Sequence, residues 1–285
     1  MNINTVGVIG AGTMGNGITQ VCAAAGLSVT MQDISADQLQ QGMNTIAGSM
    51  DRMIKKEKIN AEDKQKTLAN IKSSTDLQAL SEVDIVIEAA TENEALKLKI
   101  FQQLDQLCKP GAILASNTSS ISLTRIAGAT QRADQVIGMH FMNPVPMMAL
   151  VEIIRGLQSS DETYQQVHQL SEYIGKVPVE AKDSPGFVGN RILIPMINEA
   201  IFTLHEGIAS AEAIDEVLKL GMAHPMGPLA LADLIGLDTC LSVTRVLHEG
   251  FGDSKYRPCP LLQQMVDAGY LGRKSGRGFY NYEDR

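Results

Sequence analysis

The chain has 285 residues, of which 44% are hydrophobic and 20% are charged. This balance is typical of a globular protein that buries a sizeable core in one large or two ordinary domains. The formal net charge is −8 and no basic run is present, so nucleic acid is excluded as the main partner. No apolar run is long enough to span a bilayer, so no membrane partner is expected.

The four cysteines are scattered along the chain without a C-x-x-C pair; they are Cys22, Cys108, Cys240 and Cys259. This spacing predicts neither a disulfide framework nor a zinc site, so we expect no bound metal and a reducing compartment. The first predicted strand begins near Thr5 and leaves no room for a signal peptide, which favours the cytoplasm.

The clearest pattern lies in the first fifteen residues. An apolar β-branched strand is predicted over residues 5–9, and small apolar residues predict a helix that ends at Gly26. Between them lies a Gly-x-Gly-x-x-Gly loop, whose glycines permit a tight turn, a close approach to a pyrophosphate and close packing of the helix on the strand. The N–H groups at the helix start then face the phosphates. The loop residues are Gly10, Ala11, Gly12, Thr13, Met14 and Gly15.

A second strand, over residues 28–33, ends in an acid. Asp33 lies at the distance of about 20 residues from the glycines at which a carboxylate accepts both ribose hydroxyls of a dinucleotide. The same charge repels a 2′-phosphate, so NAD is predicted rather than NADP. The alternative is a glycine-rich turn in another α/β protein, with Asp33 as a helix cap; the order strand, loop, helix, strand and acid favours the dinucleotide.

A pair of helices is predicted next, over residues 35–71. Ser35 begins the first, whose apolar side chains recur every three or four residues, and Asn60 begins the second. The pair interrupts the alternation of strands and helices, as an arm projecting from a sheet does. Ser49 and Lys56 lie seven residues apart on the first helix, with Lys55 and Lys58 beside its end. Lysines clustered at the end of a helix ordinarily form a solvated surface.

Strands and helices then alternate as far as residue 180. Strands are predicted over residues 83–89, 112–116, 136–141, 149–154 and 176–180, and helices over 93–107, 123–126 and 161–175. This alternation predicts a doubly wound, mainly parallel sheet of the Rossmann type, in a domain of residues 1–183.

A boundary is predicted at Asp183-Ser-Pro-Gly, beyond which strand signals nearly vanish. Residues 184–285 are expected to form a smaller all-helical domain, with helices over 187–206, 211–220, 229–250 and 261–268. Its broad apolar faces cannot all be buried within one copy, so we expect a homodimer through this domain.

Two polar stretches lie at the ends of predicted strands, at the edge where ligands of open α/β sheets bind. Ser119 lies in the first, His140 ends the next strand, and the sequence Asn-Pro-Val-Pro then turns the chain so that Glu152 lies opposite His140. An imidazole held by a carboxylate is suited to taking an alcohol proton near neutral pH, and Ser119 is suited to binding the oxygen. The alternative for His140 is a structural histidine that caps a turn.

Five motifs together resemble the (3S)-3-hydroxyacyl-CoA dehydrogenases, over essentially the whole chain. They are Gly10-x-Gly12-x-x-Gly15, Ser116-Asn-Thr-Ser-Ser, His140-Phe-x-Asn-Pro, Asp183-Ser-Pro-Gly-Phe-x-x-Asn190-Arg and Gly272-Arg-Lys-x-Gly-x-Gly-Phe-Tyr. The chain looks most similar to the stand-alone bacterial members, since it has no enoyl-CoA hydratase domain, and 3-hydroxybutyryl-CoA is the implied substrate.

The resemblance implies a role for each matched residue. It makes His140 the catalytic base, Glu152 its partner, and Ser119 and Asn190 the groups at the substrate oxygen. It adds NAD contacts from Glu92, Lys97, Asn143 and Lys274, and coenzyme A contacts from Ser49 and Lys56. By pattern alone, Lys97 and Lys274 are solvated surface charges. Asn190 is a polar amide on an otherwise apolar helix close to the domain boundary and needs a partner, and the alternative for it is a hydrogen bond between helices. Two other functions remain open, a dehydrogenase of a free hydroxy acid such as gulonate and a non-enzymatic NAD-binding protein.

Overall fold

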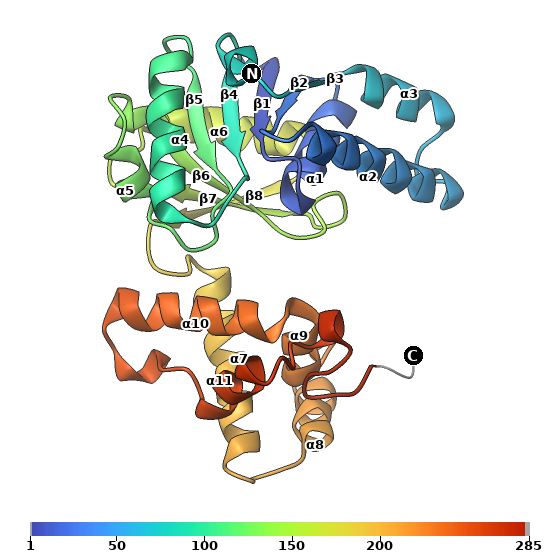
Figure 1. Cartoon of the computed structure of the whole chain (residues 1–285), viewed down its shortest axis with the longest axis vertical. Helices are drawn as coiled ribbons and strands as arrows, with labels where there is room; N and C mark the ends of the chain where they lie inside the picture. The colour runs from blue at the N-terminus through green and yellow to red at the C-terminus, as the bar shows by residue number, and fades with distance from the viewer. Residues whose placement is uncertain (1, 283–285) are drawn as a thin grey trace. The chain divides into compact units, whose positions relative to one another are not determined.

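The structure is a computed structural model that describes residues 2–282, and the chain divides into two compact units, residues 1–183 and 184–285 (Figure 1). Each unit has a hydrophobic core of its own. Within residues 2–282, no helix is both long enough and apolar enough to cross a membrane.

The first unit is built on one sheet of eight strands in the order β3-β2-β1-β4-β5-β6-β7-β8. Neighbouring strands run parallel except β6 and β7, which are antiparallel. The prediction of a doubly wound, mainly parallel sheet is therefore confirmed. The strands are β1 (Thr5–Ile9), β2 (Ser28–Gln32), β3 (Ile71–Ser74), β4 (Ile85–Glu88), β5 (Ile113–Ser116), β6 (Val136–Phe141), β7 (Leu150–Arg155) and β8 (Val177–Lys182).

The core of this unit follows the two-residue period of the strands. Alternate residues such as Val6 and Val8 of β1, and Ile137 and Met139 of β6, join one cluster with the apolar stripes of α1 (Thr13–Ala24) and α6 (Asp161–Tyr173). Burial on both sides explains the near-continuous apolar runs of β4, β5 and β6. The remaining helices after β4 are α4 (Glu94–Leu107) and α5 (Leu123–Ala127), with short 3₁₀ turns at Leu77–Leu80 and Ala133–Gln135.

The predicted helical arm is present as α2 (Ala36–Lys55) and α3 (Ala61–Ala69), which reach away from the sheet (Figure 1). Asn60 and Asp63 form a reciprocal capping box at the start of α3. The prediction that helix continues to residue 71 is wrong, because the chain turns into the edge strand β3. Its sequence Ile-Lys-Ser-Ser has two exposed central residues and no apolar alternation, so the pairing of β3 with β2 has no counterpart in the local pattern.

The second unit is helical, as predicted. Its helices are α7 (Gly189–His205), α8 (Ala211–Glu216), α9 (Pro228–Ile235), α10 (Leu237–Phe251) and α11 (Pro260–Asp267), with a π-helical turn at Val217–Gly221 and 3₁₀ turns at Ser254–Tyr256 and Arg273–Ser275. The single helix predicted over 229–250 is wrong. Gly236 adopts a φ of 102° and separates α9 from α10, while the apolar period continues through Ala232, Leu237 and Cys240 and hides the break.

Candidate active site

The glycine loop between β1 and α1 has a distinct geometry at each of its three glycines. Gly10 has a φ of 96°, and a Cβ there would lie 2.7 Å from the carbonyl oxygen of Ala89. A Cβ on Gly15 would lie only 1.7 Å from the Gly10 carbonyl oxygen, whereas a Cβ on Gly12 would meet nothing within 4 Å. The loop thus leaves open space at the middle glycine, where α1 begins without a side-chain cap. A pyrophosphate fits this arrangement.

The contrast between Gly12 and Gly15 gives a matched pair of alanine variants. We expect Gly12→Ala to keep the melting temperature of the wild type but to weaken NADH binding about tenfold, because its methyl group occupies the space of the phosphates. Gly15→Ala should destabilise the first unit by about 1–3 kcal/mol, because its methyl group overlaps the Gly10 carbonyl. Thermal unfolding and NADH fluorescence titration measure the two effects, and equal melting temperatures for both variants would contradict this interpretation.

Asp33 lies immediately after β2 and faces the glycine loop. Its Oδ2 accepts a hydrogen bond from the Ala11 N–H at 2.9 Å, and its Oδ1 accepts one from the Ser35 N–H at 3.0 Å. Each carboxylate oxygen has two lone pairs, so both oxygens can still accept a hydroxyl proton. The side chain is therefore fixed in place beside the loop, where a ribose with free hydroxyls fits and a 2′-phosphate is repelled.

His140 and Glu152 are directly opposite each other on the antiparallel strands β6 and β7, as predicted. The His140 Nδ1 and the Glu152 Oε2 lie 2.7 Å apart, and both side chains are buried. A carboxylate only accepts hydrogen bonds, so this contact assigns the imidazole hydrogen to Nδ1. Nε2 is then the nitrogen whose lone pair can take a proton, and Glu152 balances the positive charge that results.

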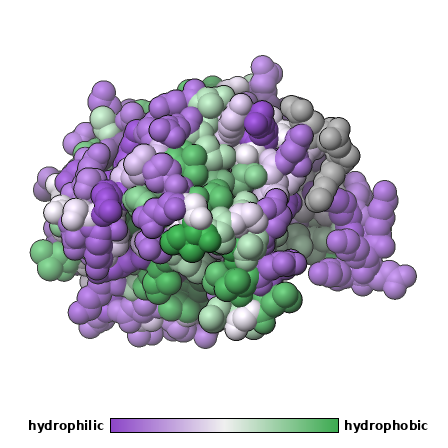
Figure 2. Space-filling view, turned by 90° about the horizontal axis from the view of Figure 1, so that it is seen from below, coloured by the Kyte–Doolittle hydropathy of each residue, from purple (hydrophilic) through white to green (hydrophobic). Residues whose placement is uncertain are grey.

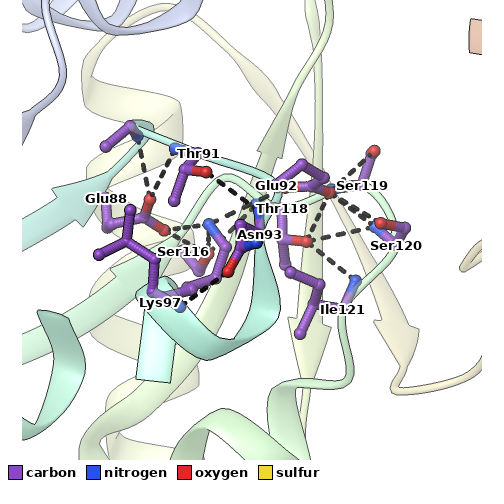
Figure 3. A network of polar contacts seen from close by, with 12 residues as sticks. Glu88, Thr91, Glu92, Asn93, Lys97, Ser116, Thr118, Ser119, Ser120 and Ile121 are labelled. Atoms are coloured by element: carbon purple, nitrogen blue, oxygen red, sulfur yellow. Dashed lines mark hydrogen bonds and ion pairs between the residues drawn. The ribbon is translucent and has the colours of Figure 1, made fainter. Parts of the chain in front are cut away.

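Ser119 lies in the loop after β5, and Glu92 holds that loop (Figure 3). The Glu92 Oε1 lies within hydrogen-bond distance of five donors on three consecutive residues. These are the Thr118 hydroxyl at 2.7 Å, the Ser119 N–H and hydroxyl at 2.7 and 3.1 Å, and the Ser120 N–H and hydroxyl at 3.1 and 2.9 Å. The loop is further joined to β6, because the Asn117 Oδ1 accepts from the Phe141 N–H at 2.9 Å. Ser119 and His140 thus belong to one connected edge of the sheet.

Lys97 is not the solvated lysine that its pattern predicts. It is only 1% exposed, and its ammonium forms an ion pair with Glu88, which is fully buried at the end of β4. The ammonium also lies 3.3 Å from the Ser116 hydroxyl and 3.9 Å from the Glu92 Oε2. Sequence reasoning missed Glu88 altogether, because an acid within an apolar strand gives no sign of its partner.

Asn143 is exposed in the turn between β6 and β7. A second buried lysine, Lys176, holds the backbone of this turn. The Lys176 ammonium donates to the carbonyl oxygens of Val145 and Met148 at 2.5 and 2.8 Å. Burial lowers the pKa of Lys176, against an opposing effect of nearby Cys22. Burial also raises the pKa of the Cys22 thiol to about 12, so this cysteine is inert, as expected of a thiol packed in the core.

Family models match nearly the whole chain. The model described as "3-hydroxyacyl-CoA dehydrogenase, NAD binding domain" matches residues 5–184, and "3-hydroxyacyl-CoA dehydrogenase, C-terminal domain" matches residues 186–282. The chain belongs to the 3-hydroxyacyl-CoA dehydrogenase family. The resemblance seen in the sequence motifs is thereby confirmed, and with it NAD as the cofactor and oxidoreductase as the class of enzyme.

Individual members of this family are similar to this chain over nearly the full length of both proteins. The 3-hydroxybutyryl-CoA dehydrogenase of Bradyrhizobium diazoefficiens is 55% identical over 280 residues, covering 98% of this chain and 96% of the relative. A probable 3-hydroxybutyryl-CoA dehydrogenase of Bacillus subtilis is 55% identical over 285 residues, covering 100% and 99%. The crystal structure of (S)-3-hydroxybutyryl-CoA dehydrogenase from Ralstonia eutropha has a TM-score of 0.97 at 60% identity, covering 99% of this chain and 100% of that one.

Two of the residues matched to the 3-hydroxyacyl-CoA dehydrogenases lie in the second unit. Asn190 is in the first turn of α7. The Lys274 ammonium donates to the Asp238 Oδ2 at 2.6 Å. Burial would raise the pKa of Asp238, but the hydrogen bond and charge of Lys274, together with backbone hydrogen bonds, outweigh it, so the pKa lies below its usual value. Lys274 is partly exposed, as its pattern predicts, and its role toward NAD stays a prediction.

The segment around Lys274 is folded around one buried carboxylate. The Asp233 side chain accepts hydrogen bonds from the N–H groups of Phe279 and Tyr280, both at 3.0 Å. A Cβ on Gly278 would lie 1.9 Å from the Asp233 Oδ1, and a Cβ on Gly272 would lie 2.3 Å from the Asp233 carbonyl oxygen. Gly272 and Gly278 of the last family motif are therefore required by close packing around Asp233.

The two residues matched to coenzyme A contacts lie on the helical arm. Ser49 is half-buried in α2, and Lys56 is exposed at the C-terminal cap of that helix, with Lys55 and Lys58 also exposed beside it. This end of the arm is a basic surface on an acidic protein, which suits an anionic ligand but does not identify one.

Proposed function

We propose that this chain catalyses the NAD-dependent oxidation of (3S)-3-hydroxybutyryl-CoA to acetoacetyl-CoA and the reverse reduction. The single observation that carries the chemistry is the buried His140–Glu152 pair, with 2.7 Å between the imidazole and the carboxylate. The choice of substrate is supported by relatives of matching length that carry the name 3-hydroxybutyryl-CoA dehydrogenase. The alcohol proton has to be removed as the hydride leaves the same carbon, and an imidazole paired with a carboxylate is suited to taking it.

In the oxidation, the His140 Nε2 takes the proton of the substrate 3-hydroxyl. Glu152 keeps the hydrogen on Nδ1 and stabilises the imidazolium that forms. NAD⁺, when bound, accepts the hydride that leaves the same carbon, which becomes the carbonyl carbon. In the reduction, the imidazolium returns its proton to the oxygen as the alcohol forms. Ser119 and Asn190 are proposed to bind that oxygen and hold it within reach of His140.

The proposed cofactor contacts begin with the glycine loop. Gly10, Ala11, Gly12, Thr13, Met14 and Gly15 would hold the pyrophosphate and Asp33 the ribose hydroxyls, and Glu92, Lys97, Asn143 and Lys274 are the further candidates. The geometry of the glycine loop and the fixed position of Asp33 support the first two assignments.

The proposed test is an absorbance assay of NADH oxidation with acetoacetyl-CoA as the substrate, run beside free acetoacetate; a gulonate-type hydroxy acid is tested in the opposite direction, by the formation of NADH from NAD⁺. We expect turnover with the coenzyme A thioester and at most traces with the free acids. Turnover of the free acids alone would favour the free hydroxy acid dehydrogenase, and binding of NADH without any turnover would favour a non-enzymatic protein.

Ser49 and Lys56 are proposed to contact coenzyme A. We expect Lys56→Ala to raise KM for acetoacetyl-CoA about tenfold while KM for NADH changes less than about twofold, because an exposed ammonium would pair with a phosphate of the thioester only. Lys72→Ala, on the exposed face of β3, is the matched control. Equal increases in both KM values would contradict a role for Lys56 in binding coenzyme A.

We further propose a cytoplasmic homodimer formed through the helical unit. Hydrophobic side chains gather on one face of this unit (Figure 2), and Ile208, Val217, Leu220 and Met222 are each more than half exposed. An exposed apolar surface of this kind is typical of a subunit interface. Sedimentation velocity is expected to give the mass of two chains, and a monomer at micromolar concentration would contradict the proposal.

A further inference from the structure

Two fully buried charges, Glu88 and Lys97, form an ion pair whose contacts within the protein the proposed chemistry leaves unexplained. Taking both out of water costs several kcal/mol each, and buried ion pairs contribute little net stability compared with apolar residues of similar size. Stability is therefore a weak reason for placing this pair beneath the edge of the sheet where Ser119 lies. The contacts of the pair give a stronger one.

The pair joins the two loops that follow β4 and β5 (Figure 3). The Glu88 Oε1 accepts from the Ala90 N–H at 2.9 Å, just after β4. The Glu88 Oε2 contacts the Lys97 ammonium and accepts from the Ser116 hydroxyl at 3.0 Å, at the end of β5. The Ser116 oxygen in turn accepts from the Thr118 N–H at 3.2 Å. The charges thus fix the backbone on both sides of the site.

Glu92 extends this network to Ser119. Its Oε1 faces five donors, although a carboxylate oxygen has only two lone pairs. The contact from the Ser119 hydroxyl, at 3.1 Å, is among the longest of the five, whereas the Ser119 N–H lies at 2.7 Å. The backbone of Ser119 is therefore held firmly, while its hydroxyl can exchange Glu92 for a substrate oxygen at little cost.

The Lys97 ammonium lies between the two carboxylates that organise these loops. It pairs with Glu88 and is 3.9 Å from the Glu92 Oε2. Lys97 is only 1% exposed, so its positive charge interacts with carboxylates of the protein itself. We infer that Lys97 and Glu88 are positioning residues for Ser119, acting through Ser116 and Glu92. This inference rests on the proposed role of Ser119 at the substrate oxygen.

The first test compares Lys97→Met with Lys97→Arg and with Lys99→Met, which alters an exposed lysine of the same helix. In Lys97→Met we expect kcat for acetoacetyl-CoA to fall about tenfold or more at saturating NADH, because the geometry of the Ser119 loop is lost. Lys97→Arg should restore part of kcat, and Lys99→Met should behave as the wild type. A weaker affinity for NADH with unchanged kcat would overturn the inference.

The second test is a double-mutant cycle with Ser119→Ala. If Lys97 acts through Ser119, Lys97→Met should cost less than about twofold in kcat once the Ser119 hydroxyl has been removed. An undiminished cost in the Ser119→Ala background would overturn the inference. Ser116→Ala, which removes one hydroxyl and no charge, replaces Lys97→Met throughout if that variant does not fold.

Hydrogen exchange measures the same coupling without catalysis. We expect Lys97→Met and Ser116→Ala to speed amide exchange at Ser119 and Ser120, which Lys99→Met should leave unchanged. Unaltered exchange in both variants would overturn the inference. A wild type that does not turn over acetoacetyl-CoA would instead refute the proposed function, and the exchange rates would still report whether the pair holds the loop.

Discussion

Replacement of His140 by glutamine is expected to lower kcat for acetoacetyl-CoA reduction by about three orders of magnitude, while the dissociation constant of NADH changes less than about threefold. The glutamine amide can still donate a hydrogen bond to Glu152, so the hairpin of β6 and β7 keeps its geometry. It cannot carry a proton to the substrate oxygen, however, so the acid of the reduction is lost. Single-turnover kinetics with NADH deuterated at the transferred position would show that hydride transfer limits the observed rate.

His168→Gln is the matched control for this variant. His168 lies on α6, partly exposed, with its Nδ1 3.5 Å from a carboxylate oxygen of Glu172. It therefore also faces an acid, but four residues away on the same helix and away from the edge of the sheet. Wild-type kcat is expected for His168→Gln. Near-wild-type kcat for His140→Gln, with hydride transfer limiting, would refute the assignment of His140 as the acid and base.

The pairing of His140 with Glu152 could be predicted from sequence because it depends on local rules. The run of apolar residues before His140 predicts a strand, and the Asn-Pro-Val-Pro segment forces a turn. Side chains directly across an antiparallel pair then face the same side of the sheet. The glycine loop and Asp33 could be predicted for a similar reason, since the three glycines lie within residues 10–15 and Asp33 follows them by about twenty residues.

The features that sequence reasoning missed depend on contacts between distant segments. Glu88 and Ser116 are 28 residues apart, and nothing near either of them indicates that Lys97 joins them underneath the loops. The same holds for Lys176, which reaches the Val145 carbonyl 31 residues away. A lone lysine in a helix or before a strand has the same local pattern whether it is solvated or buried. Only the tertiary arrangement distinguishes the two.

The two errors in secondary structure have related causes. The strand β3 is formed by pairing with β2, so its polar residues give no local signal for it. The break at Gly236 could not be predicted, because residues on both sides of it pack into the helical core and are apolar. The helical spacing of apolar residues therefore continues across the turn. In each case a tertiary requirement outweighed the local preference on which the prediction relied.

Glu152→Gln is expected to lower kcat by about two to three orders of magnitude, although it changes the volume of the side chain hardly at all. A glutamine can present its NH₂ group to the His140 Nδ1, and the imidazole hydrogen then moves to Nε2, where the proton of the alcohol must be received. The charge that stabilises the imidazolium is lost as well. Glu180→Gln, on the neighbouring strand β8 and exposed, is the control and should leave kcat unchanged.

Two further measurements decide whether Glu152 acts through His140. The double variant His140→Gln/Glu152→Gln should be no slower than His140→Gln alone, because residues that act as a unit are not additive. The melting temperature should separate a loss of orientation from a loss of folding, since glutamine preserves the packing at this buried position. A Glu152→Gln enzyme within about twofold of wild-type kcat, or a double variant slower by the product of the single effects, would mean that the carboxylate does not orient the imidazole.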